Sequence, residues 1–239
     1  LHSLPFTTRV TFFVGENGSG KSTLLEAIAA AAKLPSVGSG EIARDDTLAQ
    51  QRLLGNPLRL TWAKRVHRGF FLRAEDFFGF TKTLARMRSE FQGELARIDA
   101  EYQGRSELAK GLARGPHESS LEDMERRYGV DLDANSHGES FLELFRARFV
   151  PGGLYLMDEP EAALSPQSQL GLLAMIAGML EQDAQFIIAT HSPILLALPG
   201  ACIYEFAGGR ITDVAYDELE HVALTRAFRT GTSRKGFCG

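Results

Sequence analysis

The sequence predicts an α/β fold, in which a parallel sheet is flanked by helices and a helical insertion separates the two parts of the sheet. Apolar segments of strand length alternate with helix-forming segments near both ends of the chain, which is typical of a parallel sheet. The middle of the chain shows only the periodicity of amphipathic helices. In a parallel sheet the segments that follow the strands meet at one edge, so we expect functional residues there.

The N-terminal part of the chain begins this alternation. We expect a strand over residues 9–14 and a helix over 22–33, because an apolar run precedes a segment of strong helix formers. Gly, Ser and Pro residues predict a break over 35–40. Two further short strands are expected at 58–62 and 69–72.

A helical insertion is expected within residues 81–128. Apolar side chains recur there at steps of three and four residues, with Arg and Glu between them. The expected apolar face consists of Leu84, Met87, Phe91, Leu95, Ile98 and Tyr102. This face either packs on the chain's own domain or binds a partner as a coiled-coil helix. Basic and acidic residues are balanced here, so no charge run for DNA is evident.

The alternation resumes after residue 150. The expected strands span residues 154–157, 185–189 and 201–206, and the expected helices span 141–149, 165–181 and 193–198. We therefore expect residues 1–80 and 150–239 to form one α/β core, with residues 81–149 as a helical insertion subdomain.

Length and composition exclude several classes of protein. With 239 residues, 44% of them hydrophobic, the chain is not disordered and can bury a full core. Its net charge of −4 provides no bulk positive field for nucleic acid or anionic lipid. Cys202 and Cys238 lie far apart with no histidine at metal-ligand spacing, which favours reduced thiols. No apolar stretch is long enough to span a bilayer, and we expect a cytoplasmic protein.

A glycine-rich loop follows the first expected strand. Residues 15–22 read Gly-Glu-Asn-Gly-Ser-Gly-Lys-Ser and precede a helix, which is the setting of a phosphate-binding P-loop. The backbone N–H groups of such a loop surround a polyphosphate, while Lys21 reaches the terminal phosphates and the hydroxyl of Ser22 ligates Mg²⁺. The guanine-specifying sequence Asn-Lys-x-Asp does not occur, which argues against a GTPase. The expected nucleotide-binding residues here are Gly15, Glu16, Asn17, Gly18, Ser19, Gly20, Lys21, Ser22 and Thr23.

Two further strand ends carry polar side chains. The strand over 154–157 is followed by Asp158, which can hold Mg²⁺ through water, and by Glu159, which can polarise an attacking water. The strand over 185–189 leads into Thr190-His191-Ser192, where the imidazole of His191 can contact the γ-phosphate or the attacking water. Alone, each segment would be read as a loop start or a helix cap; their order after a P-loop favours catalytic roles.

Residues 136–139 read Ser-His-Gly-Glu and precede the helix expected at 141–149. The pattern Ser-x-x-Glu is a capping box, in which Ser136 and Glu139 satisfy the first N–H groups of a helix. A capped helix start is also an anion site. Both interpretations stay open.

In this order, the P-loop, the Ser-x-Gly-Glu helix start, the Asp-Glu-Pro-Glu strand end and the Thr-His-Ser segment resemble the ATP-binding-cassette (ABC) ATPases. The likeness is closer to their soluble branch, the predicted ATPases grouped with RecF, SMC and OLD-type proteins, and it covers most of the chain. It implies residues 15–22 as Walker A, Asp158 as the Walker B aspartate, Glu159 as the catalytic base and His191 as the switch histidine.

The same resemblance implies the ligands ATP and Mg²⁺ and an ATP-dependent homodimer. Two copies would sandwich two ATP molecules, with the signature motif of each contacting the γ-phosphate held by the P-loop of the other. Residues 136–139 would be that signature, with Ser136, Gly138 and Glu139 as its nucleotide contacts.

The chain departs from the family pattern at three places. His137 stands where the family usually has Gly, and residues 163–166 occupy the D-loop position without the usual aspartate. No glutamine stands out as the Q-loop residue, and the aromatic, charged run over 70–78 is a candidate for that space.

Three functions remain open at this point. The leading one is Mg²⁺-dependent ATP hydrolysis at a homodimer interface. The second is a nucleotide-gated clamp or switch that acts on DNA or a protein partner. The third is the ATPase subunit of a transporter, although the aromatic, Glu-rich stretch before the insertion does not resemble a permease-docking segment.

Overall fold

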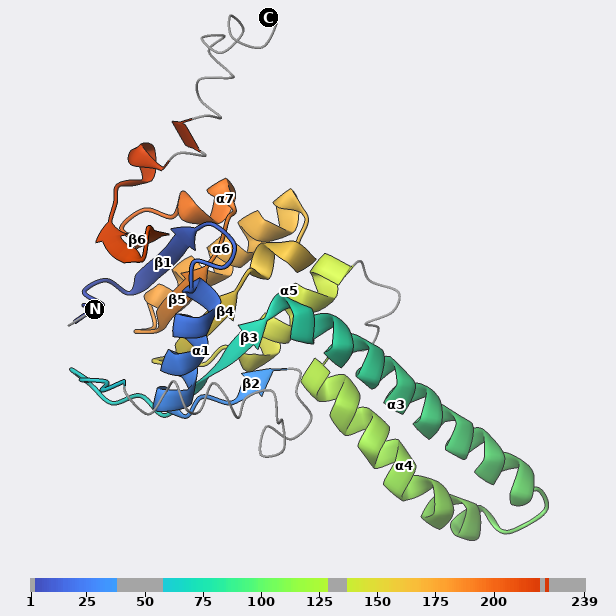
Figure 1. The fold of residues 1–239 in the computed structure, drawn as a ribbon. Coiled ribbons are helices and arrows are strands. Elements are labelled where there is room, and N and C mark those ends of the chain that lie inside the picture. The colour runs from blue at the N-terminus through green and yellow to red at the C-terminus, as the bar shows by residue number, and fades with distance from the viewer. Residues whose placement is uncertain (1–2, 38–57, 129–136, 220–221, 224–239) are drawn as a thin grey trace, which may run out of the picture.

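The computed structural model describes residues 3–37, 58–128, 137–219 and 222–223, and within them a seven-stranded sheet in the order β2-β3-β4-β5-β1-β6-β7 (Figure 1). All neighbouring strands are parallel except β6 and β7. The α/β fold with a parallel core is therefore confirmed. The strands are β1 Val10–Gly15, β2 Ser36–Val37, β3 Gly69–Arg73, β4 Leu154–Asp158, β5 Gln185–Ala189, β6 Cys202–Ala207 and β7 Arg210–Asp213.

Helices cover both faces of the sheet, which explains why the central strands are apolar on both sides. Helix α1 (Lys21–Ala32) packs on one face, where Leu25 contacts a cluster that includes Phe13 and Phe71. Helices of the other face bury a larger cluster around Phe12 and Tyr155. These helices are α5 His137–Arg148, α6 Pro166–Leu180 and α7 Pro193–Leu196, and single-turn 3₁₀ helices occur at η3 Pro160–Ala163 and η4 Tyr216–Glu218.

A stack of aromatic rings joins α5 to the sheet. The ring centroid of Phe145 lies 4.7 Å from that of Phe141 and 5.1 Å from that of Phe149. Phe149 in turn lies 4.7 Å from Tyr155 of β4. The hydroxyl of Tyr155 accepts from the Val150 amide at 2.6 Å and donates to the Val150 carbonyl at 2.9 Å. The end of α5 is therefore fixed to the strand that carries Asp158.

Most expected elements are found within two residues of their predicted bounds, but two predictions were wrong and one strand was not predicted. Residues 58–62 form no strand; Leu58 and Trp62 instead pack, partly buried, against the cluster beneath α1. The partner of β3 on that side is β2, a two-residue strand inside the expected break at 35–40. The strand β7 was not predicted, because its sequence Arg-Ile-Thr-Asp is short and largely exposed. It pairs antiparallel with β6 through a tight turn.

Two long helices project from the sheet as a hairpin (Figure 1). Helix α3 spans Ala74–Glu101 and α4 spans Glu107–Tyr128. Between them the chain turns at Gly104, whose φ of 81° favours glycine. Asp99 pairs with both Lys110, at 3.0 Å, and Arg114. The hairpin is thus joined across its two helices by ion pairs.

The expected apolar face of this insertion is only partly buried. Ile98 is 7% exposed, whereas Met87 is 39% exposed. Helix α3 begins at Ala74, directly after β3, so it starts inside the range expected for the core. The proposed division of the chain at residue 81 stays a prediction. No helix in the described part of the chain is both long and apolar enough to cross a bilayer.

We expect Phe145→Ala to lower the free energy of unfolding by about 3–5 kcal/mol, because a fully buried ring of the α5 stack would leave a cavity. Denaturant-induced unfolding followed by circular dichroism measures this change. The control is Leu108→Ala, since Leu108 is 75% exposed and its truncation should change the unfolding free energy by less than about 0.5 kcal/mol. Equal effects of the two substitutions would contradict the packing described for α5.

Candidate active site

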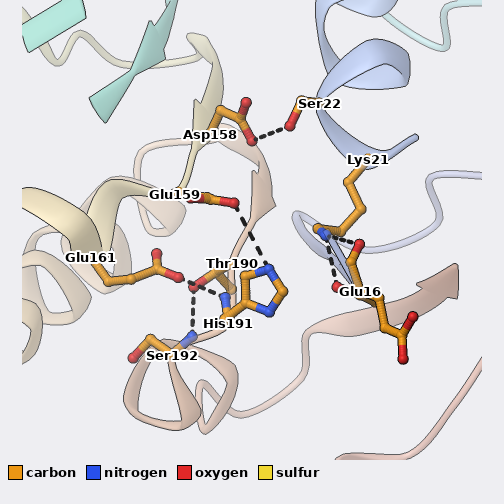
Figure 2. Close-up of polar contacts among 10 residues, drawn as sticks. Glu16, Lys21, Ser22, Asp158, Glu159, Glu161, Thr190, His191 and Ser192 are labelled. Atoms are coloured by element: carbon orange, nitrogen blue, oxygen red, sulfur yellow. Dashed lines mark hydrogen bonds and ion pairs between the residues drawn. The ribbon is translucent and has the colours of Figure 1, made fainter. Parts of the chain in front are cut away.

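Three neighbouring strands, β4, β5 and β1, end at the same edge of the sheet. The P-loop follows β1, the carboxylates of Asp158 and Glu159 lie at the end of β4, and His191 follows β5 (Figure 2). Because the strands are parallel and in register, segments far apart in the sequence come together here. This confirms the expected meeting of the three motifs at one edge.

Glycines give the P-loop its backbone path. Gly15, Gly18 and Gly20 have φ values of 141°, 79° and 98°, which favour glycine. At Gly15 a Cβ atom would lie 2.4 Å from the carbonyl oxygen of Phe206, so only glycine permits this approach of β1 to β6. Gly20 is the N-cap of α1 and provides no side chain to cap the helix. The first N–H groups of α1 therefore remain directed to the loop, as in an anion site.

Lys21 is buried inside this loop, with 4% of its surface exposed. Its ammonium group donates to the carbonyl oxygens of Gly15 at 2.7 Å and Glu16 at 2.9 Å. Burial lowers the pKa of Lys21, and the carboxylates of Glu159, Asp158 and Glu161 act in the opposite direction. A cation surrounded by carbonyl dipoles and N–H groups is suited to a polyphosphate, which would complete its coordination.

Ser22 and Asp158 form the second part of the site. The Ser22 hydroxyl donates to Oδ1 of Asp158 at 3.1 Å, and Asp158 is 9% exposed. Burial raises the pKa of Asp158, and the hydrogen bond from Ser22 offsets part of that rise. Glu159 adds to the rise, while Arg73 and Lys21 oppose it. A buried carboxylate beside a hydroxyl oxygen fits Mg²⁺, which binds through one or two protein oxygens together with phosphate and water.

No cluster of three or more His, Cys, Asp or Glu side chains able to hold a metal is present among the described residues. The described residues therefore do not form a site in which side chains alone coordinate a metal ion. The pair Ser22 and Asp158 fits the alternative, in which Mg²⁺ is shared between the protein and a bound nucleotide.

Glu159 lies just beyond β4, where its φ of 49° places it in the left-handed region. Non-glycine residues in this region store strain and occur frequently at functional sites. The backbone is held there by a hydrogen bond of 2.9 Å from the Glu159 amide to the Ala189 carbonyl. Its carboxylate is 45% exposed and lies 3.8 Å from Nε2 of His191. The turn therefore presents Glu159 to the open side of the site.

The loop that carries His191 is fixed by two side chains that were not singled out from the sequence. Oε1 of Glu161 accepts from the His191 amide at 2.6 Å. The hydroxyl of Ser192, the N-cap of α7, donates to Oε1 of Gln169 at 2.5 Å. The second glutamate of Asp-Glu-Pro-Glu was the available signal for Glu161, whereas nothing in the sequence distinguishes Gln169. Both hold the segment around His191 in place.

A cavity of about 730 Å³ lies beside the P-loop. One wall is formed by residues 14–19 and by His191, as the motifs lead one to expect. The opposite wall comes from residues 205–209, at the end of β6 and its turn, and from Leu219. Sequence analysis did not place these residues at the site, because β6 becomes a neighbour of β1 only in the folded sheet.

The segment expected as a signature motif leads into α5. Gly138 and Glu139 belong to the first turn of α5, as does His137, and Ser136 lies outside the described residues. None of the described residues of α5 lines the cavity beside the P-loop. Neither interpretation of this segment, cap or anion site, is tested by the structure.

Solved structures of similar arrangement are distant. The Smc head domain of Pyrococcus furiosus, with an extended coiled coil and bound to the C-terminal domain of ScpA, is 12% identical with a TM-score of 0.42; the match covers 92% of this chain and 93% of that one. A nucleotide-free ATP-binding cassette from an ABC transporter is 18% identical with a TM-score of 0.44, over 85% of this chain and 79% of that one.

Sequence comparison is more local. The macrolide export ATP-binding/permease protein MacB of Pectobacterium atrosepticum is 26% identical over 185 residues, which cover 74% of this chain and 25% of the relative. The chain thus spans about a quarter of the length of that protein. Residues 2–46 match a family model described as "AAA domain", and residues 140–197 match one described as "AAA domain, putative AbiEii toxin, Type IV TA system". Together the two matches cover the P-loop, Asp158, Glu159 and His191, so the segments that carry the site are similar to AAA domains, and the site has the arrangement of a P-loop ATPase.

Proposed function

We propose that the chain is a Mg²⁺-dependent ATP hydrolase in which two copies enclose two ATP molecules and Glu159 acts as the base. The observation that carries this proposal is the hydrogen bond of 3.1 Å between Ser22 and Asp158. It joins the P-loop helix to the end of β4, next to Glu159. A phosphate site, a cation site and a base would thus lie at the same edge of the sheet.

Each residue has a distinct part in this reaction. Lys21 and the N–H groups of the P-loop bind the β- and γ-phosphates and oppose the charge that develops on them. Ser22 and Asp158 would hold Mg²⁺, which supplies charge neutralisation between the two phosphates. Glu159, exposed toward the open side, polarises the attacking water and accepts its proton. His191, beside both Glu159 and the cavity, hydrogen-bonds the γ-phosphate or that water.

A second copy is proposed because ABC ATPases, which this sequence resembles, bind ATP between two protomers. Ser136, Gly138 and Glu139 would contact the γ-phosphate held by the partner subunit, as the resemblance to ABC ATPases implies. The start of α5 is suited to this role, since a helix N-terminus favours an anion. We assign the chain to the RecF-, SMC- and OLD-like branch and to the cytoplasm, where the free thiol of Cys202 would stay reduced.

The second candidate, a nucleotide-gated clamp or switch, is favoured by the hairpin of α3 and α4. The hairpin extends from the sheet and carries exposed apolar side chains at Leu108 and Leu112. We propose the hairpin as the insertion through which DNA or a protein partner would sense the nucleotide state. The third candidate, a transporter subunit, is supported by the match to a quarter of an export ATP-binding/permease protein.

We expect Glu159→Gln to reduce ATP turnover by at least about 100-fold while changing the Kd for ATP by less than about threefold, because the amide cannot accept a proton. Phosphate release and binding of a fluorescent ATP analogue measure the two effects. Glu90→Gln is the control, since Glu90 is an exposed carboxylate on α3. Turnover of the Glu159→Gln protein equal to that of the control would exclude the role of base.

Specific activity should rise with protein concentration if a second copy completes the nucleotide-binding site. Turnover per chain, measured from nanomolar to micromolar protein with excess Mg²⁺ and ATP, gives the first test. Sedimentation of the Glu159→Gln protein with and without ATP gives the second, since bound ATP should favour the dimer. Activity independent of concentration, together with a monomer in ATP, would contradict the shared site.

We expect Glu161→Gln to lower kcat by about tenfold with little change in KM for ATP. The substitution weakens the contact that holds the His191 amide, so the imidazole loses its fixed position while the P-loop stays intact. Steady-state ATPase kinetics separate the two constants. Glu181→Gln, at the end of α6, serves as the control. A selective rise in KM would assign Glu161 to nucleotide binding instead.

A further inference from the structure

We propose that Glu26 is a positioning residue of the metal site: it holds the guanidinium of Arg73 away from Asp158 and so keeps the oxygens of Asp158 free for a cation. This inference rests on the proposed role of Ser22 and Asp158 as Mg²⁺ ligands. It assigns a function to Glu26, which belongs to none of the nucleotide-binding motifs, and to Arg73, which lies in the aromatic, charged run over 70–78.

The sheet brings Arg73 next to Asp158. In the parallel ladder of β3 and β4, Arg73 is the registered partner of Asp158, and both are the last residues of their strands. Neighbouring strands lie about 4.8 Å apart, and registered residues project to the same face. Without another partner, the long side chain of Arg73 would have the Asp158 carboxylate within easy reach.

Helix α1 lies on this face and contacts both residues. Ser22 and Glu26 are four positions apart, so they occupy the same side of the helix. Ser22 donates to Asp158, and one turn further along the helix Glu26 forms an ion pair with Nη2 of Arg73. The helix thus presents a hydroxyl to one strand end and a carboxylate to the next.

The ion pair draws Arg73 back along its own strand. The guanidinium lies over the ring of Phe71, 5.6 Å from its centroid, two residues before Arg73. The pair is shielded, with side-chain exposures of 20% for Arg73 and 11% for Glu26. Arg73 also retains a buried Nε that has no hydrogen-bond partner among the described residues. Arg73 therefore has a free hydrogen-bond donor, and the ion pair with Glu26 determines the position of its guanidinium group.

The carboxylate with which Arg73 pairs matters for the metal site. A shielded guanidinium that loses its carboxylate is driven to the nearest alternative, because an unpaired buried charge is costly. Here that alternative is Asp158. A bidentate Arg–carboxylate pair would occupy the lone pairs that a cation needs. Removal of Glu26 is thus expected to block the metal site, whereas removal of Arg73 is not.

The experiment compares Glu26→Gln, Arg73→Gln and the double variant. The probe is a fluorescent ATP analogue whose Kd is measured with excess EDTA and with excess Mg²⁺; the ratio gives the gain in affinity due to the metal. The Mg²⁺ concentration at half-maximal ATPase activity provides a second readout. Glu125→Gln is the control, because Glu125 and Arg88 form a partly buried ion pair of 2.9 Å in the hairpin, away from Asp158.

We expect Glu26→Gln to reduce the metal-dependent gain by about tenfold and to raise the half-maximal Mg²⁺ concentration by a similar factor. Arg73→Gln and the double variant should each stay within about threefold of the wild type, so that loss of Arg73 rescues loss of Glu26. The control should behave as the wild type, and the Kd in EDTA should be nearly constant throughout.

Three outcomes would overturn the inference: an unchanged Glu26→Gln protein, an Arg73→Gln protein as impaired as Glu26→Gln, or a double variant without rescue. The last two would assign the pair a purely structural role. If Glu26→Gln does not fold, Arg73→Gln alone decides, since a tenfold loss there contradicts the inference and retention supports it. A wild-type protein with no gain from Mg²⁺ would instead refute the proposed function.

Discussion

The parallel pairing of β4, β5 and β1 is the constraint on which the rest of the molecule depends. Because these strands are in register, Asp158 is opposite Ala189, and the P-loop begins one strand further along the same edge. A slip of β4 by one residue against β5 would turn the side chain of Asp158 to the opposite face of the sheet, away from Ser22. The apolar packing of both faces fixes this register. The stability of the core and the geometry of the site therefore have one origin.

The site holds two charged groups that are buried, although charged groups are more stable in water. Lys21 and Asp158 are both buried, and burial opposes the charged form of each. The opposite charges of Lys21 and Asp158 offset part of this cost of burial. Hydrogen bonds offset a further part: the ammonium group of Lys21 donates to two carbonyl oxygens, and Asp158 accepts from the hydroxyl of Ser22. Mg²⁺ and polyphosphate carry the charges that such an arrangement lacks, so the site is suited to bind them as a pair.

The sequence predicted those parts of the fold and site that depend on local pattern. The P-loop, the strand before Asp158 and the segment around His191 are each recognisable from neighbouring residues, and the sheet edge brings them together as expected. Residues that reach the site through pairing in space were not predictable in this way. Glu205 and Phe206 line the cavity because β6 joins β1, and Gln169 acts through Ser192 from a neighbouring helix. The strand predicted at 58–62 was wrong for a similar reason, since the sequence does not show what a segment packs against. Its alternating apolar side chains pack against the cluster beneath α1, and the segment pairs with no strand of the sheet.

Helix α3 starts at the residue after Arg73 and runs for 28 residues, which at 1.5 Å per residue is about 42 Å. Its base contacts η3, the turn that follows Glu159, and its residue Phe77 packs on Phe141 of α5 at 4.5 Å between centroids. A rigid rod of this length converts rotation into displacement. A tilt of about 10° at the base moves the far end by about 7 Å, more than the pitch of a helical turn. The hairpin is therefore long enough that an ångström-scale change at its base would move its tip by several ångströms, which is enough to make or break a contact there.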